Sequence, residues 1–351
     1  MSNSGFFKKL SSDLPKLIGR ILIAVIAVAL LLFLLVALGT LKGGKDKPEE
    51  TPVAEEITPS EPETEAETET STEPETETET ETETEEETTT EAYSAEPREI
   101  VEIKSLGTSE IGELASKYDQ EVKRYVIGYE DVSTDENNRP VFAADLLGTF
   151  EGTDAKLKVY CADENTPRAA LSFMVDDDAP QAEAILDILK EKEVHAIFFV
   201  THTFAAEHPD LIRRMIDEEH EIGNYSYTDP QEGVANLEPL DQVFEAFNMQ
   251  RYMDLGFEYN MQRYCLNHGY WSQLSVMLAS EMGYEVCFPS VNFMDDDAEL
   301  SVEDGVVLEG LEKNLHNGAV YGFHCTNELV TRILPTLIDF IREQGFQVIP
   351  L

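Results

Sequence analysis

The feature that most constrains the fold is the alternation of apolar strands and amphipathic helices through residues 168–351. Residues 169–175 and 194–200 are continuous apolar runs, which are typical of strands buried on both faces. Pro180 opens one helical segment, and residues 209–219 have the apolar spacing of another. Because short connections join these elements, the pattern predicts a parallel sheet with helical crossovers.

The same patterns continue to the last residue. Helices are expected at residues 240–255, 272–282 and 329–343, and strands at residues 264–266, 284–288, 306–308, 319–323 and 346–349. This number of strands favours an irregular (β/α) barrel over an open nucleotide-binding sheet. The sequence also has no glycine-rich phosphate loop after the first strand, which counts against nucleotide binding.

The region before this alternation, residues 99–160, has mixed signals. Residues 111–126 have helical spacing, residues 135–140 form a turn cluster, and residues 157–161 alternate like an edge strand. The region is interpreted either as a small cap or as a lead-in to the barrel.

Residues 21–39 form an uncharged apolar run that predicts one transmembrane helix. At about 1.5 Å per residue, the run is long enough to span a hydrocarbon core of about 30 Å. Residues 1–20 would then form a cytoplasmic tail. The alternative is a cleaved signal peptide, for which Ala37-Leu38-Gly39 resembles a small-x-small cleavage site.

Residues 48–98 form a Glu/Thr/Pro-rich tract that predicts a disordered spacer. The tract has almost no apolar side chains to bury, and its like charges keep it extended. A short tail, one membrane span and a long spacer indicate a folded domain held at the outer face of a membrane.

The chain carries a formal net charge of −45, and not all of it comes from the spacer. A surface of this sign repels polyanions, so nucleic acids and anionic cell-wall polymers are disfavoured as partners. Neutral or amino-bearing glycans stay compatible with it. The four cysteines show no CxxC spacing, which excludes a zinc knuckle and leaves either disulfide pairing or buried thiols.

Three motifs follow one another along the chain: residues 171–180 (LSFMVDDDAP), residues 220–224 (HEIGN) and residues 318–324 (GAVYGFH). In sequence and in order they resemble motifs of the polysaccharide deacetylase family, also called the NodB-homology domain. The resemblance covers residues 168–351, about half the chain, and implies the irregular (β/α) barrel of that family. It also implies a glycan partner, either peptidoglycan or another acetylated polysaccharide.

The resemblance also assigns catalytic roles to individual residues. Asp177 falls at the position of the general base, Asp178 at a metal-ligand position, and His324 at the position of the general acid. Arg263 falls at the position that orients the base. In that chemistry a divalent metal activates a water molecule and polarises the amide carbonyl, while the acid protonates the leaving amine.

Tyr225 and Asp229 stand where the family has two zinc-binding histidines. A phenol has a pKa of about 10 and must ionise before it binds a divalent cation well, which makes Tyr225 a poor ligand. Asp229 offers a hard oxygen donor instead of an imidazole. Zinc is therefore disfavoured, whereas a Mg²⁺, Mn²⁺ or Ca²⁺ site formed by Asp178 and Asp229 stays open.

Three hypotheses follow. The first is a membrane-tethered, deacetylase-like domain that binds a cell-surface glycan with impaired catalysis, the second is an active de-N-acetylase with an oxygen-rich metal site, and the third is a non-catalytic interaction module. Five aromatic residues in loops after strands are candidates for stacking on sugars: Tyr225, Tyr227, Tyr264, Tyr270 and Trp271. Six histidines without partner spacing are interpreted as structural or surface residues: His195, His202, His208, His220, His268 and His316.

Overall fold

The computed structural model describes residues 101–125, 128, 132–176, 179–293 and 302–351. Within these ranges no helix combines the length and the apolar character that crossing a membrane requires. The predicted anchor at residues 21–39 and the predicted spacer at residues 48–98 lie outside the described part of the chain.

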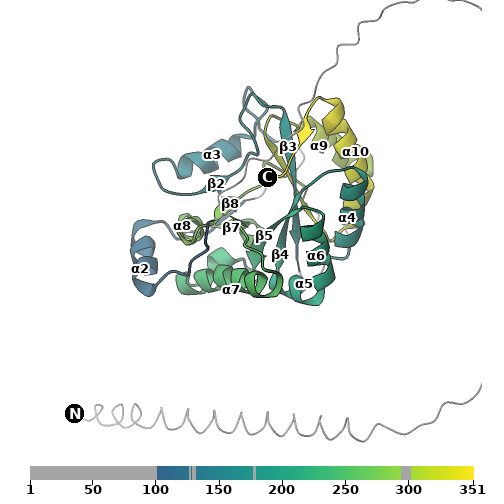
Figure 1. Cartoon of the computed structure of the whole chain (residues 1–351). Coiled ribbons are helices and arrows are strands. Elements are labelled where there is room, and N and C mark those ends of the chain that lie inside the picture. Colours follow the sequence, from purple (N-terminus) through teal and green to yellow (C-terminus); the bar gives the residue numbers. More distant parts are fainter. Residues whose placement is uncertain (1–100, 126–127, 129–131, 177–178, 294–301) are drawn as a thin grey trace, which may run out of the picture. The chain divides into compact units, whose positions relative to one another are not determined.

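A single sheet of parallel strands forms the centre of the described region (Figure 1). Its order is β2-β8-β6-β5-β4-β3-β10-β9, with β11 beside β3, and every ladder in it is parallel. The strands are β2 (Leu157–Lys158), β3 (Arg168–Val175), β4 (Ile197–Thr201), β5 (Glu221–Ser226), β6 (Arg263–Tyr264), β8 (Glu285–Cys287), β9 (Val291–Asn292), β10 (Ala319–His324) and β11 (Gln347–Val348). A separate antiparallel ribbon pairs β1 (Lys123–Arg124) with β7 (Tyr270–Trp271).

The sheet is strongly curved, because strands from its two ends are joined by a very short connection. β8 lies near one end of the order and β9 at the other, yet only residues 288–290 connect them. Such a link spans at most about 15 Å. The backbone N–H of Cys161, after β2, also donates to the carbonyl of Gly318, before β10, at 2.9 Å. The predicted α/β architecture is confirmed as a half-barrel.

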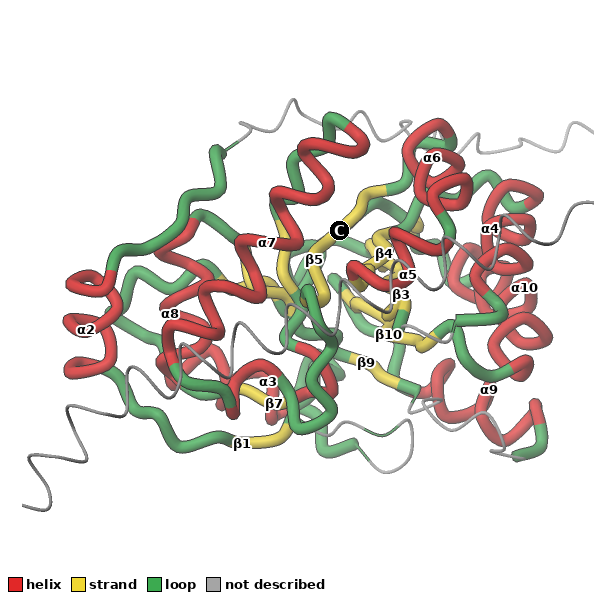
Figure 2. The backbone as a smooth tube through the Cα atoms, turned by 90° about the horizontal axis from the view of Figure 1, so that it is seen from below, coloured by secondary structure: helices red, strands yellow, loops and turns green. Residues whose placement is uncertain are grey.

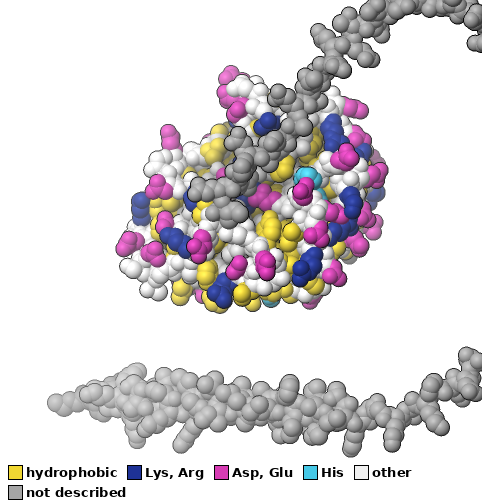
Figure 3. Space-filling view, viewed as in Figure 1, with side chains coloured by type: hydrophobic (Ala, Val, Ile, Leu, Met, Phe, Trp, Pro, Cys, Tyr) yellow, Lys and Arg dark blue, Asp and Glu magenta, His cyan; other side chains and the backbone are white. Residues whose placement is uncertain are grey.

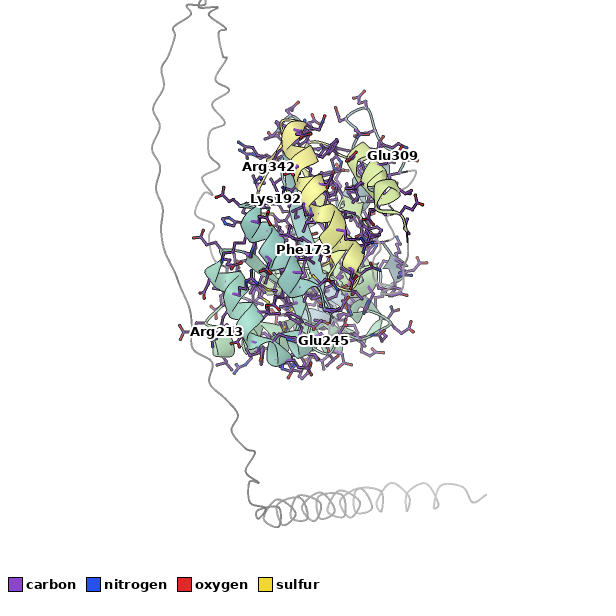
Figure 4. The ribbon with its side chains drawn as sticks, turned by 90° about the vertical axis from the view of Figure 1, so that its right-hand side faces the viewer. Phe173, Lys192, Arg213, Glu245, Glu309 and Arg342 are labelled. Atoms are coloured by element: carbon purple, nitrogen blue, oxygen red, sulfur yellow. The ribbon has the colours of Figure 1, made fainter. Side chains whose placement is uncertain are left out.

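Helices cover the outer face of the strands (Figures 1 and 2). Successive residues of β3 alternate between two cores: Phe173 packs outward under the helices, whereas Met174 faces the barrel interior. Figure 4 shows Phe173 behind the outer helices, with Lys192 and Arg342 at their ends. The helices are α2 (Thr108–Lys117), α3 (Val141–Thr149), α4 (Ala182–Glu191), α5 (His202–Glu207), α6 (Pro209–Asp217), α7 (Pro239–Phe257), α8 (Gln273–Met282), α9 (Asp304–Lys313) and α10 (Glu328–Glu343), with short 3-10 turns η1 (Val234–Asn236) and η2 (Asn267–Gly269).

The segment before the barrel is built into the same core. Ile103, Ile111 and Leu146 are buried in the core that lies beneath the helices, and β2 forms the edge of the main sheet, as predicted. The predicted helix at residues 111–126 ends early, at Lys117. It ends there because the chain beyond it extends into β1, which pairs with β7.

The prediction of a strand at residues 306–308 is wrong. These residues lie in α9, where Val307 and Leu311 are buried four positions apart on one helical face. Asp304 stabilises the first turn of α9 and pairs with Arg332 of α10 at 2.9 Å. The apolar run Val306-Val307-Leu308 was too short to distinguish a strand from a helix by its periodicity.

The four cysteines are free thiols, and three of them, Cys265, Cys287 and Cys325, are buried. This agrees with the buried-thiol alternative.

Gly223 of β5 allows β4 and β5 to pack closely inside the barrel. A Cβ atom at this position would lie 2.5 Å from the Phe199 ring carbon Cε1. We expect Gly223→Ala to lower the free energy of unfolding by about 1–3 kcal/mol, because the buried ring must move. The control is Gly112→Ala in α2, where the added methyl meets open space and is expected to stabilise by about 0.5–1 kcal/mol. Equal effects of both substitutions in urea unfolding would contradict the packing argument.

Two buried histidines should make the fold sensitive to acid. Burial lowers the pKa of His220 and of His316 to about 4. Both stay neutral in the fold at pH values where the unfolded chain, with pKa about 6.5, binds protons. The free energy of unfolding should therefore fall as the pH drops from about 6.5 to about 4, by at most about 3 kcal/mol per histidine.

The measurement is urea unfolding across this pH range for the wild type, His220→Asn and, as a control, the exposed His208→Gln, a residue that does not shift the pKa of His220. His220→Asn should flatten the dependence on pH, and His208→Gln should leave it unchanged. A slope that is the same in all three proteins would rule out His220 as a source of the acid sensitivity.

Candidate functional site

The parallel ladders bring distant polar residues to one edge of the barrel. β10, β3, β4 and β5 are neighbours, and the carboxyl end of each strand lies at the same edge. Asp176 follows the last residue of β3, His324 ends β10, and Tyr225 lies one residue before the end of β5. Side chains at this edge of a parallel sheet are well placed to form a site.

Asp176 and His324 form the first contact of the site. The carboxylate oxygen Oδ2 of Asp176 lies 2.9 Å from Nδ1 of His324, and both side chains are mostly buried. A carboxylate next to Nδ1 fixes the tautomer and orientation of an imidazole. The other oxygen of Asp176, Oδ1, is buried and has no hydrogen-bond partner among the described residues.

This contact was only half predicted from the sequence. His324 lies in the site as expected, but its partner is Asp176, whereas the sequence resemblance implies roles for Asp177 and Asp178. Those two residues lie outside the described part of the chain. The overlooked signal was position: Asp176 is the first polar residue after an eight-residue strand whose side chains are almost all buried.

Asp229 and His268 form a second contact. Oδ1 of Asp229 accepts a hydrogen bond from Nδ2 of Asn267 at 2.9 Å and lies 3.1 Å from Nε2 of His268. Burial alone would raise the pKa of Asp229, but His268 and Asn267 outweigh it and hold this pKa below its usual value. The Asp229 carboxylate in turn raises the pKa of His268 against the opposing effect of burial. His268, for which the sequence predicts a structural or surface role, thus contacts Asp229 in the site.

The two contacts belong to one cluster of charges. Asp176 raises the pKa of His268, whereas His324 lowers the pKa of both His268 and Asp229.

The loop that carries Asp229 is held by a buried carboxylate of α7. Glu245 accepts hydrogen bonds from the backbone N–H groups of Tyr227 and Thr228 at 2.9 and 2.7 Å, and from the Thr228 hydroxyl at 2.7 Å. The N–H of Asp229 donates to Oγ of Ser226 at 3.0 Å, and Asp229 has a left-handed backbone with φ of 45°. The Asp229 carboxylate is therefore fixed in position.

Tyr225 faces the barrel interior beside Met174 and Cys265, and only 1% of it is exposed. Its hydroxyl accepts a hydrogen bond from the backbone N–H of His268 at 3.1 Å. Burial, and then the nearby charge of Asp176, raise the pKa of Tyr225 well above its ordinary value. The phenol is therefore neutral near pH 7.

Arg263 does not make the contacts expected of a residue that orients the base. Its fully buried guanidinium pairs with Glu221 and, at 3.1 Å, with Glu285. Glu221 and Glu285 are the first residues of β5 and β8, so these contacts lie at the amino ends of the strands. The expectation fails because the side chain of Arg263 is directed down the barrel interior, toward two carboxylates that neutralise its buried charge.

A pocket of about 50 Å³ that opens to solvent lies over this edge. Burial raises the pKa of Cys265 to about 12, which excludes a thiolate nucleophile near pH 7. The lining residues come from both the barrel and the segment before it: Arg124, Tyr125, Met174, Tyr225, Cys265, Leu266, His268, Gly269, Phe288, Pro289, Asn292 and His324.

The predicted sugar-stacking residues differ in their surroundings. Tyr225 lines the pocket but is only 1% exposed, and Tyr227 lies against His202 with ring centroids 4.2 Å apart. The ring of Tyr270 lies under Arg124. Tyr264 and Trp271 are buried in the core, so they are not available to a ligand.

The described residues do not fit a zinc ion. Tyr225 is protonated and hydrogen-bonded, and the Oδ1 atom of Asp229 is already engaged by Asn267 and His268. Across residues 101–351, apart from the stretches that are not described, no three His, Cys, Asp or Glu side chains form a group able to hold a metal ion. A neutral phenol and a shared carboxylate cannot replace two imidazoles as zinc ligands.

Comparisons with known proteins agree with this architecture. Residues 163–287 match the family model described as polysaccharide deacetylase. Peptidoglycan-N-acetylmuramic acid deacetylase PdaA of Bacillus subtilis (strain 168) is 28% identical over 162 residues, which are 46% of this chain and 61% of PdaA. The chain thus spans less than two thirds of the length of that relative.

Solved structures support the same fold. The structure of Bacillus subtilis PdaA, a family 4 carbohydrate esterase, superimposes with a TM-score of 0.56 at 23% identity, covering 66% of this chain and 96% of PdaA. A family 4 pseudoenzyme from Bacillus anthracis, BA3943, superimposes with a TM-score of 0.51 at 22% identity, covering 56% of this chain and 67% of that chain. The chain is thus similar to polysaccharide deacetylases over residues 163–287, and the solved structures support the half-barrel fold.

The contact between Asp229 and His268 can be tested by titration. We expect Asp229→Asn to lower the pKa of His268 measured by NMR, because the carboxylate that favours the imidazolium is removed. The control is Asp254→Asn, an exposed substitution on α7. A His268 pKa that is unchanged by Asp229→Asn would show that the two side chains do not interact in solution.

Proposed function

We propose that this polysaccharide deacetylase family domain binds an acetylated glycan in the pocket at the carboxyl ends of its strands, with impaired metal-dependent deacetylation. The observation that carries the proposal is the state of Tyr225, which is buried, protonated and hydrogen-bonded at a position where the family binds zinc. Relatives named for peptidoglycan and chito-oligosaccharide deacetylation suggest the class of glycan. The domain keeps the fold of these deacetylases but has other side chains at the expected metal-ligand positions. This combination favours glycan binding over catalytic deacetylation.

The contacts around His324 support glycan binding. Asp176 holds the imidazole by Nδ1, so the ring is oriented relative to the pocket that it lines. An oriented imidazole can exchange hydrogen bonds with a sugar hydroxyl or an acetamido group. This role needs no bound metal.

A second candidate function is deacetylation with an oxygen-coordinated divalent cation. The observation in its favour is Oδ1 of Asp176, a buried carboxylate oxygen without a hydrogen-bond partner in the described residues. Hard cations such as Mg²⁺, Mn²⁺ and Ca²⁺ prefer oxygen ligands. Asp178 and Asp229 would be the expected partners of Asp176 in that case.

We also propose that the domain is tethered outside a membrane by residues 21–39 and held away from it by the spacer at residues 48–98. The proposal is supported by the uncharged apolar run and by the Glu/Thr-rich composition that follows it. Such an arrangement would give the pocket access to a polymer around the cell.

Restoring the missing imidazoles should restore zinc binding. We expect the double variant Tyr225→His with Asp229→His to bind zinc about a thousandfold or more tightly than the wild type, because each zinc ligand contributes several kcal/mol. Calorimetry on the full-length protein measures this directly. The control is Tyr227→His, the same substitution at a position outside the pocket lining.

Measurements on the wild type and these variants also distinguish glycan binding with impaired catalysis from deacetylation with an oxygen-coordinated cation. Calorimetry with Mg²⁺, Mn²⁺ and Ca²⁺ and an assay for acetate released from chito-oligosaccharides test the oxygen-coordinated alternative. Tight zinc binding by the unmodified chain, with acetate release, would refute impaired catalysis. Binding of an acetylated oligosaccharide without acetate release would support it, and absence of both would favour the non-catalytic interaction module.

A further inference from the structure

Two consecutive cations of β1 lie over two consecutive aromatic rings of β7. Lys123 is opposite Trp271 and Arg124 is opposite Tyr270 in the antiparallel ribbon. The Lys123 ammonium and the Arg124 guanidinium each lie 5.3 Å from the centroid of the ring that faces them, within cation–π distance. Figure 2 shows β1 running beside β7. Successive strand residues point to opposite faces, so the ribbon presents the two cations on opposite sides.

Arg124 lines the pocket, whereas Lys123 does not. The Nε–H of Arg124 points to the backbone carbonyl of His268 at 3.4 Å, which places the guanidinium beside His268. No ion pair joins Arg124 to a carboxylate of the residues that the structure describes, and its terminal nitrogens make no hydrogen bond to them. Arg124 is thus an exposed cation at the pocket without a carboxylate partner among the described residues.

We propose that Arg124 binds a carboxylate group on the glycan that occupies this pocket, so that the preferred ligand is an acetylated sugar bearing one carboxylate. The inference rests on the proposed glycan-binding function and adds the substrate class. A guanidinium matches a carboxylate with two parallel hydrogen bonds, and stacking on Tyr270 holds it in place before the ligand arrives.

The charge of the whole chain favours a single carboxylate over a denser anion. With a net charge of −45, the protein repels polyanions and groups carrying two charges. Acidic side chains are spread across the face shown in Figure 3, without gathering into one patch. A single carboxylate, by contrast, is attracted at short range by an unpaired guanidinium.

Arg124 is positioned by contacts between the barrel and the segment that precedes it. The neighbouring residue, Tyr125, donates its backbone N–H to the carbonyl of Gly269 at 2.7 Å and its hydroxyl to the carbonyl of Pro289 at 2.8 Å. Gly269 permits this approach, because a Cβ atom there would lie 2.6 Å from the carbonyl oxygen of Tyr125. The family match begins at residue 163, so Arg124 contributes a cation to the pocket from a segment that lies outside the matched residues.

The test measures the binding of three tetrasaccharides to the full-length protein by calorimetry. One contains only N-acetylglucosamine, the second has N-acetylmuramic acid in place of one N-acetylglucosamine, and the third is the second with its one lactyl carboxylate converted to an amide. The wild type should bind the carboxylate form about tenfold to a hundredfold more tightly than the amide form. Arg124→Gln should abolish this preference, and Arg124→Lys should retain part of it.

The matched control is Lys123→Gln, which removes the adjacent cation and its contact with Trp271 but leaves the pocket intact. It should keep the full preference for the carboxylate form. Equal wild-type binding of the carboxylate and amide forms would overturn this inference alone, as would an equal loss of preference in Lys123→Gln. Absence of wild-type binding to all three tetrasaccharides would overturn the proposed function and this inference with it.

Discussion

The site depends on the parallel pairing of β10, β3, β4 and β5. Because these strands run side by side in the same direction, residues separated by up to about 150 positions in the chain end at one edge. His324 and Asp176 meet there at 2.9 Å, and Tyr225 and Asp229 follow from β5. Parallel strands buried on both faces need helices as crossovers, so the same pairing also dictates the helical layer around the barrel.

The polar side chains beside the pocket are held in position by the surrounding protein. Glu245 holds the loop before Asp229, and Asn267 and His268 occupy one oxygen of its carboxylate. Tyr225 is held in the same way by the backbone of His268. Tyr225 and Asp229, at the positions where the sequence resemblance implies two zinc-binding histidines, each have a partner within the protein, which stabilises the fold without a metal ion.

The net charge of the whole chain and the local charges at the pocket have different effects on an anionic ligand. The large negative charge keeps polyanions away at long range, whereas inside the pocket the local balance is set by Asp176, Asp229, His268 and Arg124. Long-range repulsion is screened by salt over about 10 Å, but contacts within a pocket are screened much less. A ligand with one negative charge can therefore be bound at the pocket, although the protein as a whole repels polyanions.

The sequence by itself determined the α/β class, most of the strands and helices, and the presence of His324 and Asp229 near the carboxyl ends of strands. It did so because buried strands and amphipathic helices have distinct periodicities. Only the tertiary structure identified Asp176, His268 and Arg124 as neighbours, since they come from segments far apart in the chain and carry no common motif. The tertiary structure also directed Arg263 toward Glu221 and Glu285, because a buried guanidinium pairs with the carboxylates that packing brings to it.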